Sequence, residues 1–153
     1  MLFLYDRSSK VYAKVFKRHK RAWGLSIYDF LNYPNNSLGY AMGQFYVTKG
    51  FDIMPKLENH DAFHVITQTN TEIHDEISMQ YLLMGNGKRS LYMYAMILIG
   101  TLIYPEFIRY YIFSFRKGKS LSIFHDLEFK DYLSQPLVEI QYSLLIKSKF
   151  QTI

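Results

Sequence analysis

The feature that most constrains the fold is a series of helix-length segments, each separated from the next by residues that start or stop helices. Ser37 precedes one such segment and Gly50 follows it, and these residue types are common at the two ends of helices. Residues 68–71 and 85–87 interrupt the chain in the same way. No stretch alternates apolar and polar residues as a half-buried strand does. We therefore expect an all-α protein with several helices.

The helices expected from this pattern cover most of the chain. Thr69 and Glu72 have capping-box spacing, which predicts that a helix begins there, antiparallel to the helix before it because the connection is short. Residues 91–104 form the most apolar segment, which is too short to span a membrane comfortably. We expect it to be a buried core helix that could also line a lipid groove. Residues 116–119 read as a basic loop. The expected helices are residues 10–23, 38–49, 56–67, 69–84, 91–104, 110–115, 126–133 and 136–146.

A cluster of potential metal ligands lies in the two central helices. His60 and His64 are four residues apart, so both side chains project from one face of the predicted helix. Asp61, three residues before His64, falls within the same arc. Glu76 follows the break between the two helices. Because the second helix is expected to run antiparallel to the first, Glu76 should lie at about the same level along the helix axes as His64. These four residues are a candidate metal site.

The ligand types restrict which metal could bind. The chain has no cysteine, so the ligands must be nitrogen and oxygen. Two histidines with a carboxylate occur in hydrolytic zinc sites and in non-haem iron sites, and the sequence does not choose between these metals. Asp61 is either a fourth ligand, which we favour, or a group that orients one imidazole. A surface histidine pair without metal is the alternative.

Other polar residues have simpler interpretations. Asp75, beside Glu76, either reaches the site or lies in solvent, which we favour, and Asp126 is expected to cap a helix. We find no serine nucleophile elbow, phosphate-binding loop or dinucleotide fingerprint, and no catalytic residue can be named.

Composition bears on the partners. The net charge of +5 is too mild to suggest nucleic acid. The 49% hydrophobic and 18% aromatic residues suggest contact with lipid or a large apolar ligand, with ordinary variation in core composition as the alternative. Residues 10–23 predict a basic amphipathic helix, which either lies on an anionic membrane or packs its apolar side in the core. The first residues do not resemble a signal peptide. We expect a cytoplasmic location, with peripheral attachment to the inner face of the membrane as an alternative.

His60, Asp61, His64 and Glu76, in this order and spacing, resemble the motif of the coenzyme Q biosynthesis family often called Coq-four. The resemblance covers about residues 26–141 of what we expect to be a single domain, residues 1–153. One departure is Asp75, where the family usually has glycine. Further matches are Pro34, Ser37-Leu38-Gly39, Phe45, Gly118-Lys119 and the segment from Leu133 to Glu139.

The resemblance implies an all-helical ubiquinone biosynthesis protein with a divalent metal, usually taken as zinc, beside a groove for a polyprenyl lipid. It also implies membrane attachment, association with other quinone-biosynthesis enzymes and a homo-oligomer. Two hypotheses follow. The chain is a metal-dependent enzyme (a lyase) that decarboxylates a 4-hydroxy-3-methoxy-5-polyprenylbenzoate oxidatively at ring carbon C1, or it is a lipid-binding scaffold whose metal does no chemistry.

Overall fold

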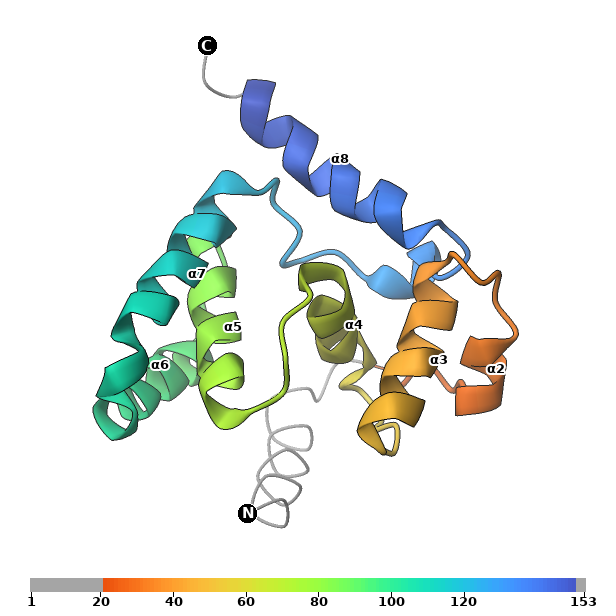
Figure 1. Ribbon diagram of the computed structural model, residues 1–153, viewed down its shortest axis with the longest axis horizontal. Coiled ribbons are helices and arrows are strands. Elements are labelled where there is room, and N and C mark those ends of the chain that lie inside the picture. Colours follow the sequence, from red (N-terminus) through yellow and green to blue (C-terminus); the bar gives the residue numbers. More distant parts are fainter. Residues whose placement is uncertain (1–20, 151–153) are drawn as a thin grey trace. The chain divides into compact units, whose positions relative to one another are not determined.

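The computed structural model describes residues 21–150, and all the named secondary-structure elements in this range are helices (Figure 1). The all-α prediction is therefore confirmed for the described residues. Most of the predicted basic helix, residues 10–20, lies outside them. The elements are α2 (Ile27–Leu31), α3 (Leu38–Lys49), α4 (Glu58–Thr67), α5 (Ile73–Gly85), α6 (Leu91–Ile103), η1 (Pro105–Phe107), α7 (Ile108–Ser120), η2 (Phe129–Tyr132) and α8 (Leu137–Phe150), where η marks a 3₁₀-helix.

The chain forms two compact units. Within the described residues, the first unit comprises residues 21–65 and 128–137, and the second comprises residues 66–127 and 138–150. Each unit therefore uses two separate stretches of the chain.

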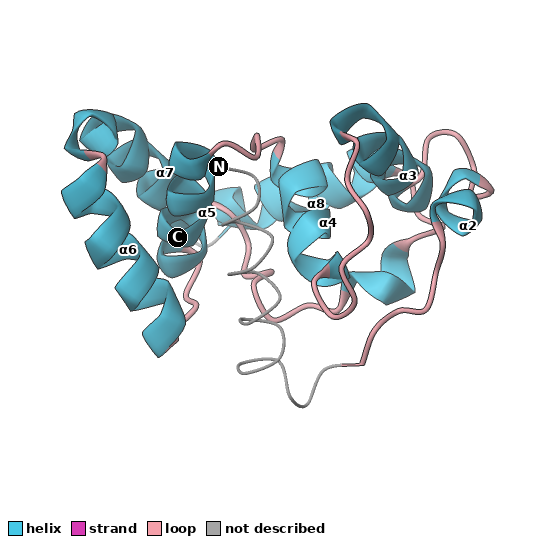
Figure 2. Ribbon diagram, turned by 90° about the horizontal axis from the view of Figure 1, so that it is seen from below, coloured by secondary structure: helices cyan, strands magenta, loops and turns pink. Residues whose placement is uncertain are grey.

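An aromatic core and a close helix approach hold the first unit together. Phe30 on α2 lies between the rings of Trp23 and Tyr46, at centroid distances of 6.3 and 5.7 Å. Helices α2 and α3 lie side by side in both ribbon views (Figure 2). Their connection approaches α3 at Gly39, where an added Cβ would lie 2.5 Å from the Tyr33 ring. The predicted cap Ser37 is confirmed, since its hydroxyl accepts from the Tyr40 amide.

The segment of residues 128–137 completes this unit. The Phe129 ring packs against Phe63 at 5.7 Å, and the Phe129 amide donates to Oδ1 of Asn59 over 2.8 Å. The α-helix predicted over residues 126–133 is therefore wrong. Only a short 3₁₀-helix forms, because the Phe129 amide bonds a side chain of α4 rather than a carbonyl of its own turn.

The second unit is built on the contact between α5 and α7. An added Cβ at Gly118 of α7 would collide with the Leu82 carbonyl of α5, and one at Gly85 would collide with the Phe115 carbonyl. The basic loop predicted at residues 116–119 is wrong, since α7 continues through it to Ser120. Gly118 serves helix packing here and does not end the helix.

A buried asparagine follows α5. Asn86 is 3% exposed, and its Nδ2 donates to the carbonyls of Gly118 and Ser122. Its Oδ1 accepts from the amides of Phe124 and His125 at 2.9 and 3.1 Å. The Asn86 side chain thus makes hydrogen bonds to two backbone carbonyls and two backbone amides at the end of α7 and in the turn that follows it.

Helix α6 differs from its prediction as a buried core helix. Only Met93 and Gly100 are buried on it, and Gly100 faces Ile77 of α5. Most of its large apolar side chains are exposed. Among the described residues no single helix is long and apolar enough to span a membrane, although α6 together with the η1–α7 segment passes that test as a pair bent by 106°.

Candidate metal centre

Helix α4 carries both histidines of the motif. It begins at Glu58 after Lys56, whose φ is 73°, and ends before Gln68, whose φ is 56°. These left-handed residues bound a helix of ten residues, which is nearly three turns. Nε2 of His60 and Nε2 of His64 lie 3.2 Å apart, and the two rings are nearly perpendicular at 87°.

An aromatic ring covers one face of the His64 imidazole. His64 is 3% exposed, and the Phe45 ring of α3 stacks on it at 6.2 Å with an interplanar angle of 15°. Phe45 in turn meets Tyr46 and Phe51 edge to face. This packing fixes the orientation of the imidazole and limits the access of water to it.

Asp61 has a partner on α3. The hydroxyl of Tyr46 donates to Oδ2 of Asp61 over 2.9 Å. Burial, then the charge and hydrogen bond of Asp61, and then the charge of Glu58 raise the pKa of Tyr46 well above its usual range. The phenol therefore remains a donor, and Asp61 is held as its acceptor.

Glu58, which belongs to no recognisable sequence motif, is buried in the first turn of α4. Its Oε1 accepts from the Trp23 amide over 3.0 Å, and the Trp23 indole donates to Glu128 over 2.8 Å. Oε2 of Glu58 is buried without a hydrogen-bond partner. No short sequence pattern predicts the hydrogen bond between Glu58 and Trp23, because the two residues are 35 positions apart.

Glu76 lies in the first turn of α5 and is 7% exposed. The capping box of this helix is formed by Glu72 and Asp75, and not by Thr69 and Glu72 as predicted. Its first turn is thus fixed by side chains next to Glu76. A carboxylate at a helix N-terminus is also favoured by the helix dipole.

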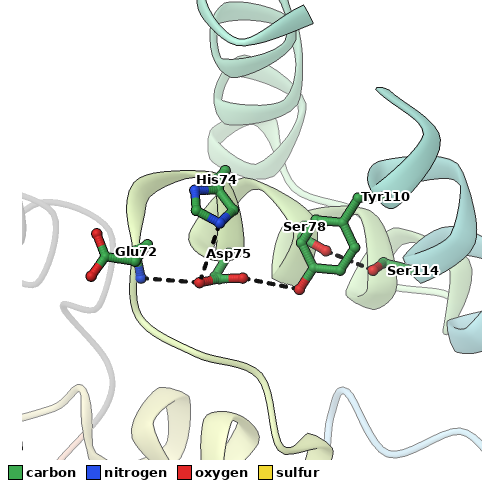
Figure 3. A network of polar contacts seen from close by, with 6 residues as sticks. All are labelled: Glu72, His74, Asp75, Ser78, Tyr110 and Ser114. Atoms are coloured by element: carbon green, nitrogen blue, oxygen red, sulfur yellow. Dashed lines mark hydrogen bonds and ion pairs between the residues drawn. The ribbon is translucent and has the colours of Figure 1, made fainter. Parts of the chain in front are cut away.

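Asp75 is buried, contrary to its predicted solvent position. One of its oxygens accepts from the Tyr110 hydroxyl over 3.0 Å, and the other lies 3.3 Å from the Glu72 amide and 3.7 Å from Nε2 of His74 (Figure 3). His74 stacks on Phe107 at 4.2 Å. Burial is the main cause that raises the pKa of Tyr110, so this phenol also remains a donor.

His60 and His64 form a pair in the first unit that could hold a metal ion, since their Nε2 atoms lie 3.2 Å apart. Glu76 lies in the second unit, so its assignment as a third ligand stays a prediction, as does that of Asp61 as a fourth. Nitrogens bound about 2.0–2.1 Å from a zinc ion at the tetrahedral angle are about 3.3 Å apart. The separation of 3.2 Å between the two Nε2 atoms fits that value. Two imidazoles and a carboxylate also suit non-haem iron, so the residues fit a divalent metal without identifying it.

The remaining motif-like residues are structural. Nδ1 of His125 lies 3.0 Å from the Asn86 carbonyl oxygen. Asp126 does not cap a helix, since the next element is η2 and its N-cap is Glu128. His125 therefore belongs to the turn after α7.

Comparison of the chain with models of protein families and with curated proteins finds no match.

Proposed function

We propose that this chain is a metal-binding protein that acts on, or presents, the head group of a polyprenylated aromatic in quinone biosynthesis. The observation that carries the proposal is the His60 and His64 pair, whose Nε2 atoms lie 3.2 Å apart on one face of α4. The buried position of His64 and the aromatic side chains around it support an apolar ligand near the metal. The resemblance of the motif to the Coq-four family supplies the substrate class.

Nε2 of each histidine and the Glu76 carboxylate would hold the ion. The metal would supply Lewis-acid stabilisation to a carboxylate or phenolate of the head group, and iron would add redox capacity that zinc lacks. Phe45 would keep the His64 ring in place, and Tyr46 would hold Asp61 beside His60. For the enzyme, we propose oxidative decarboxylation at ring carbon C1: the carboxyl group leaves as CO2, water supplies the hydroxyl that replaces it, and O2 takes up the two electrons and is released as H2O2.

Native mass spectrometry of protein purified without chelators tests the metal. We expect one divalent ion per chain, and we expect the ion to be lost in His64→Ala and in Glu76→Ala. His74→Ala is the matched control, because His74 is close to Glu76 in sequence but is not one of the proposed ligands. Metal-free protein that takes up neither Zn²⁺ nor Fe²⁺ would contradict the proposal.

The second candidate is a scaffold that binds the lipid without chemistry. A site with an open coordination position favours the enzyme, and a closed site favours the scaffold. If the protein is an enzyme, His64→Ala abolishes turnover of a prenylated hydroxybenzoate with little change in melting temperature. If it is a scaffold, the same substitution mainly lowers the melting temperature, and co-purified lipid in the mass spectrum identifies the ligand.

A further inference from the structure

The largest apolar side chains of α6 face outward. Leu91, Leu98 and Leu102 are 86%, 64% and 74% exposed. Residues 91, 94, 95, 98, 99, 102 and 103 are exposed, and their spacing places them on one side of the helix. All seven are apolar or aromatic, and α6 contains no charged residue. Contiguous surfaces of this kind mark sites of interaction with proteins or membranes.

The next helix, α7, also exposes apolar side chains in its first half and exposes basic side chains in its second half. Ile108, Ile112 and Phe113 are 39%, 41% and 62% exposed in its first half. Arg116 and Lys119 are exposed in its second half. We call the exposed apolar residues of α6 together with Ile108, Ile112 and Phe113 the α6–α7 face.

The charge around this face has one dominant sign. Residues 88–120 contain six basic residues and one acidic residue, Glu106, which gives a net charge of +5 for this stretch. The basic residues lie before α6 and along α7, and none lies within α6. The six are Lys88, Arg89, Arg109, Arg116, Lys117 and Lys119.

We propose that the α6–α7 face docks on an anionic lipid membrane, with α6 in the interface and the basic residues against the lipid head groups. Thirteen residues of helix span about 20 Å, less than the roughly 30 Å of a bilayer core, so α6 lies along the surface and does not cross it. The bent pair of α6 with η1–α7 has the length and apolar composition of a membrane segment. Apolar burial plus attraction to anionic lipid is the usual basis of such binding.

Lipid explains this face better than a second protein does. A protein interface usually surrounds its apolar centre with a polar rim, whereas the exposed positions of α6 are apolar along its whole length. A bilayer interior needs no such rim. The basic residues beyond the apolar positions match the layer of anionic head groups.

Vesicle flotation of the full chain tests the proposal, with phosphatidylcholine alone and with added phosphatidylglycerol. We expect the chain to float with the anionic vesicles. The double variant Leu98→Gln, Leu102→Gln should reduce this binding about tenfold or more. Val138→Gln is the matched control, because Val138 is an apolar residue, 73% exposed, on α8. It should bind as the unchanged chain does.

Charge and depth give two further measurements. Arg116→Gln and Lys119→Gln should each weaken binding to anionic vesicles about fivefold and have little effect on neutral ones. Leu98→Trp should be quenched by brominated lipid beyond the signal of Trp23, the one native tryptophan. The quenching measurement on Leu98→Trp does not depend on whether the double glutamine variant folds.

Three results would overturn the proposal. One is unchanged vesicle binding by the double variant. The second is loss of binding only when Lys14, Lys17, Arg18 and Arg21 become Gln, which would assign the membrane contact to the N-terminal residues. The third is conversion of a dimer to a monomer by the double variant with vesicle binding intact, which would make the face a subunit interface. His64→Ala should leave flotation unchanged, so failure of the metal proposal is distinguishable.

Discussion

The Tyr46 hydroxyl on α3 donates a 2.9 Å hydrogen bond to Oδ2 of Asp61, the residue that separates His60 from the rest of the motif on α4. Through this bond and the stacking of Phe45 on His64, two adjacent residues of α3 contact the metal motif. The position of the histidine pair in the first unit therefore depends on α3 as much as on α4.

Tyr46→Phe tests that dependence. Because Tyr46 is 1% exposed, removing its hydroxyl takes away a part-buried hydrogen bond to Asp61, and we expect the free energy of unfolding to fall by about 1–3 kcal/mol. Urea denaturation measures the change. Tyr40→Phe is the control, since the Tyr40 hydroxyl makes an exposed bond to Gln44. Equal effects of the two substitutions would show that the bond to Asp61 adds nothing.

Tyr111→Phe should act in the opposite direction. Tyr111 is fully buried, and its hydroxyl has no hydrogen-bond partner. Removing it should raise the free energy of unfolding by about 1 kcal/mol. Tyr81 stacks on Tyr111 but shares a 2.8 Å bond with Thr101, so Tyr81→Phe should instead destabilise the protein. Thermal denaturation of the two variants gives the comparison.

The same residue predicts a dependence on alkaline pH. Burial first, and then neighbouring negative charges beginning with Glu106, raise the pKa of Tyr111 from 10.0 to about 12. The folded state thus keeps a proton that the unfolded state releases, so this contribution is complete below pH 10 and is lost as the pH rises towards 12. Tyr111→Phe should show a smaller loss of stability over this range. Parallel pH curves for the variant and the unchanged protein would contradict the assignment.

Asn86→Ala should be among the most damaging single changes in the second unit. It removes the side-chain partners of two carbonyls and two amides in a buried turn. We expect a loss of about 3–5 kcal/mol in the free energy of unfolding. Asn70→Ala, at an exposed position, is the control. Guanidinium denaturation measures both.

Gly118→Ala tests the crossing of α5 and α7. Its Cβ would meet the Leu82 carbonyl and the Asn86 amide, which are backbone atoms and cannot rotate away. We expect a loss of about 3 kcal/mol or more, although alanine favours helix in isolation. Lys119→Ala on the exposed side of α7 should be close to neutral. A stabilised Gly118→Ala variant would contradict the close approach.

Local signals predicted the ends of several helices correctly. Ser37 caps α3, and Gly50 ends it with a φ of 65°, because both effects depend only on neighbouring residues. Gly118 shows where this reasoning fails. Glycine ends a helix or lets two helices touch, and the sequence alone does not say which. The presence of Leu82 opposite decides the matter.

Burial was the other source of error. The sequence does not show whether Asp75 lies in solvent or in the interior. In the structure, a hydrogen bond from the Tyr110 hydroxyl of α7 stabilises its buried carboxylate. Helix α6 was predicted to be buried and is largely exposed. An apolar sequence indicates that a helix favours an apolar contact, but it does not say which element provides that contact. The spacing of His60 and His64 did predict that their imidazoles meet on one face of α4, because helical periodicity over four residues is a local property.

The division of the first unit between residues 21–65 and 128–137 has a consequence for biosynthesis. A ribosome releases residues 66–127 before it delivers Phe129, the aromatic ring that packs on Phe63. The first unit therefore cannot complete its core during the early part of translation, although all of its longer helices have already emerged. A gene fragment that stops at residue 127 would encode both histidines and Glu76 but would leave the helix that carries the histidines without its covering segment.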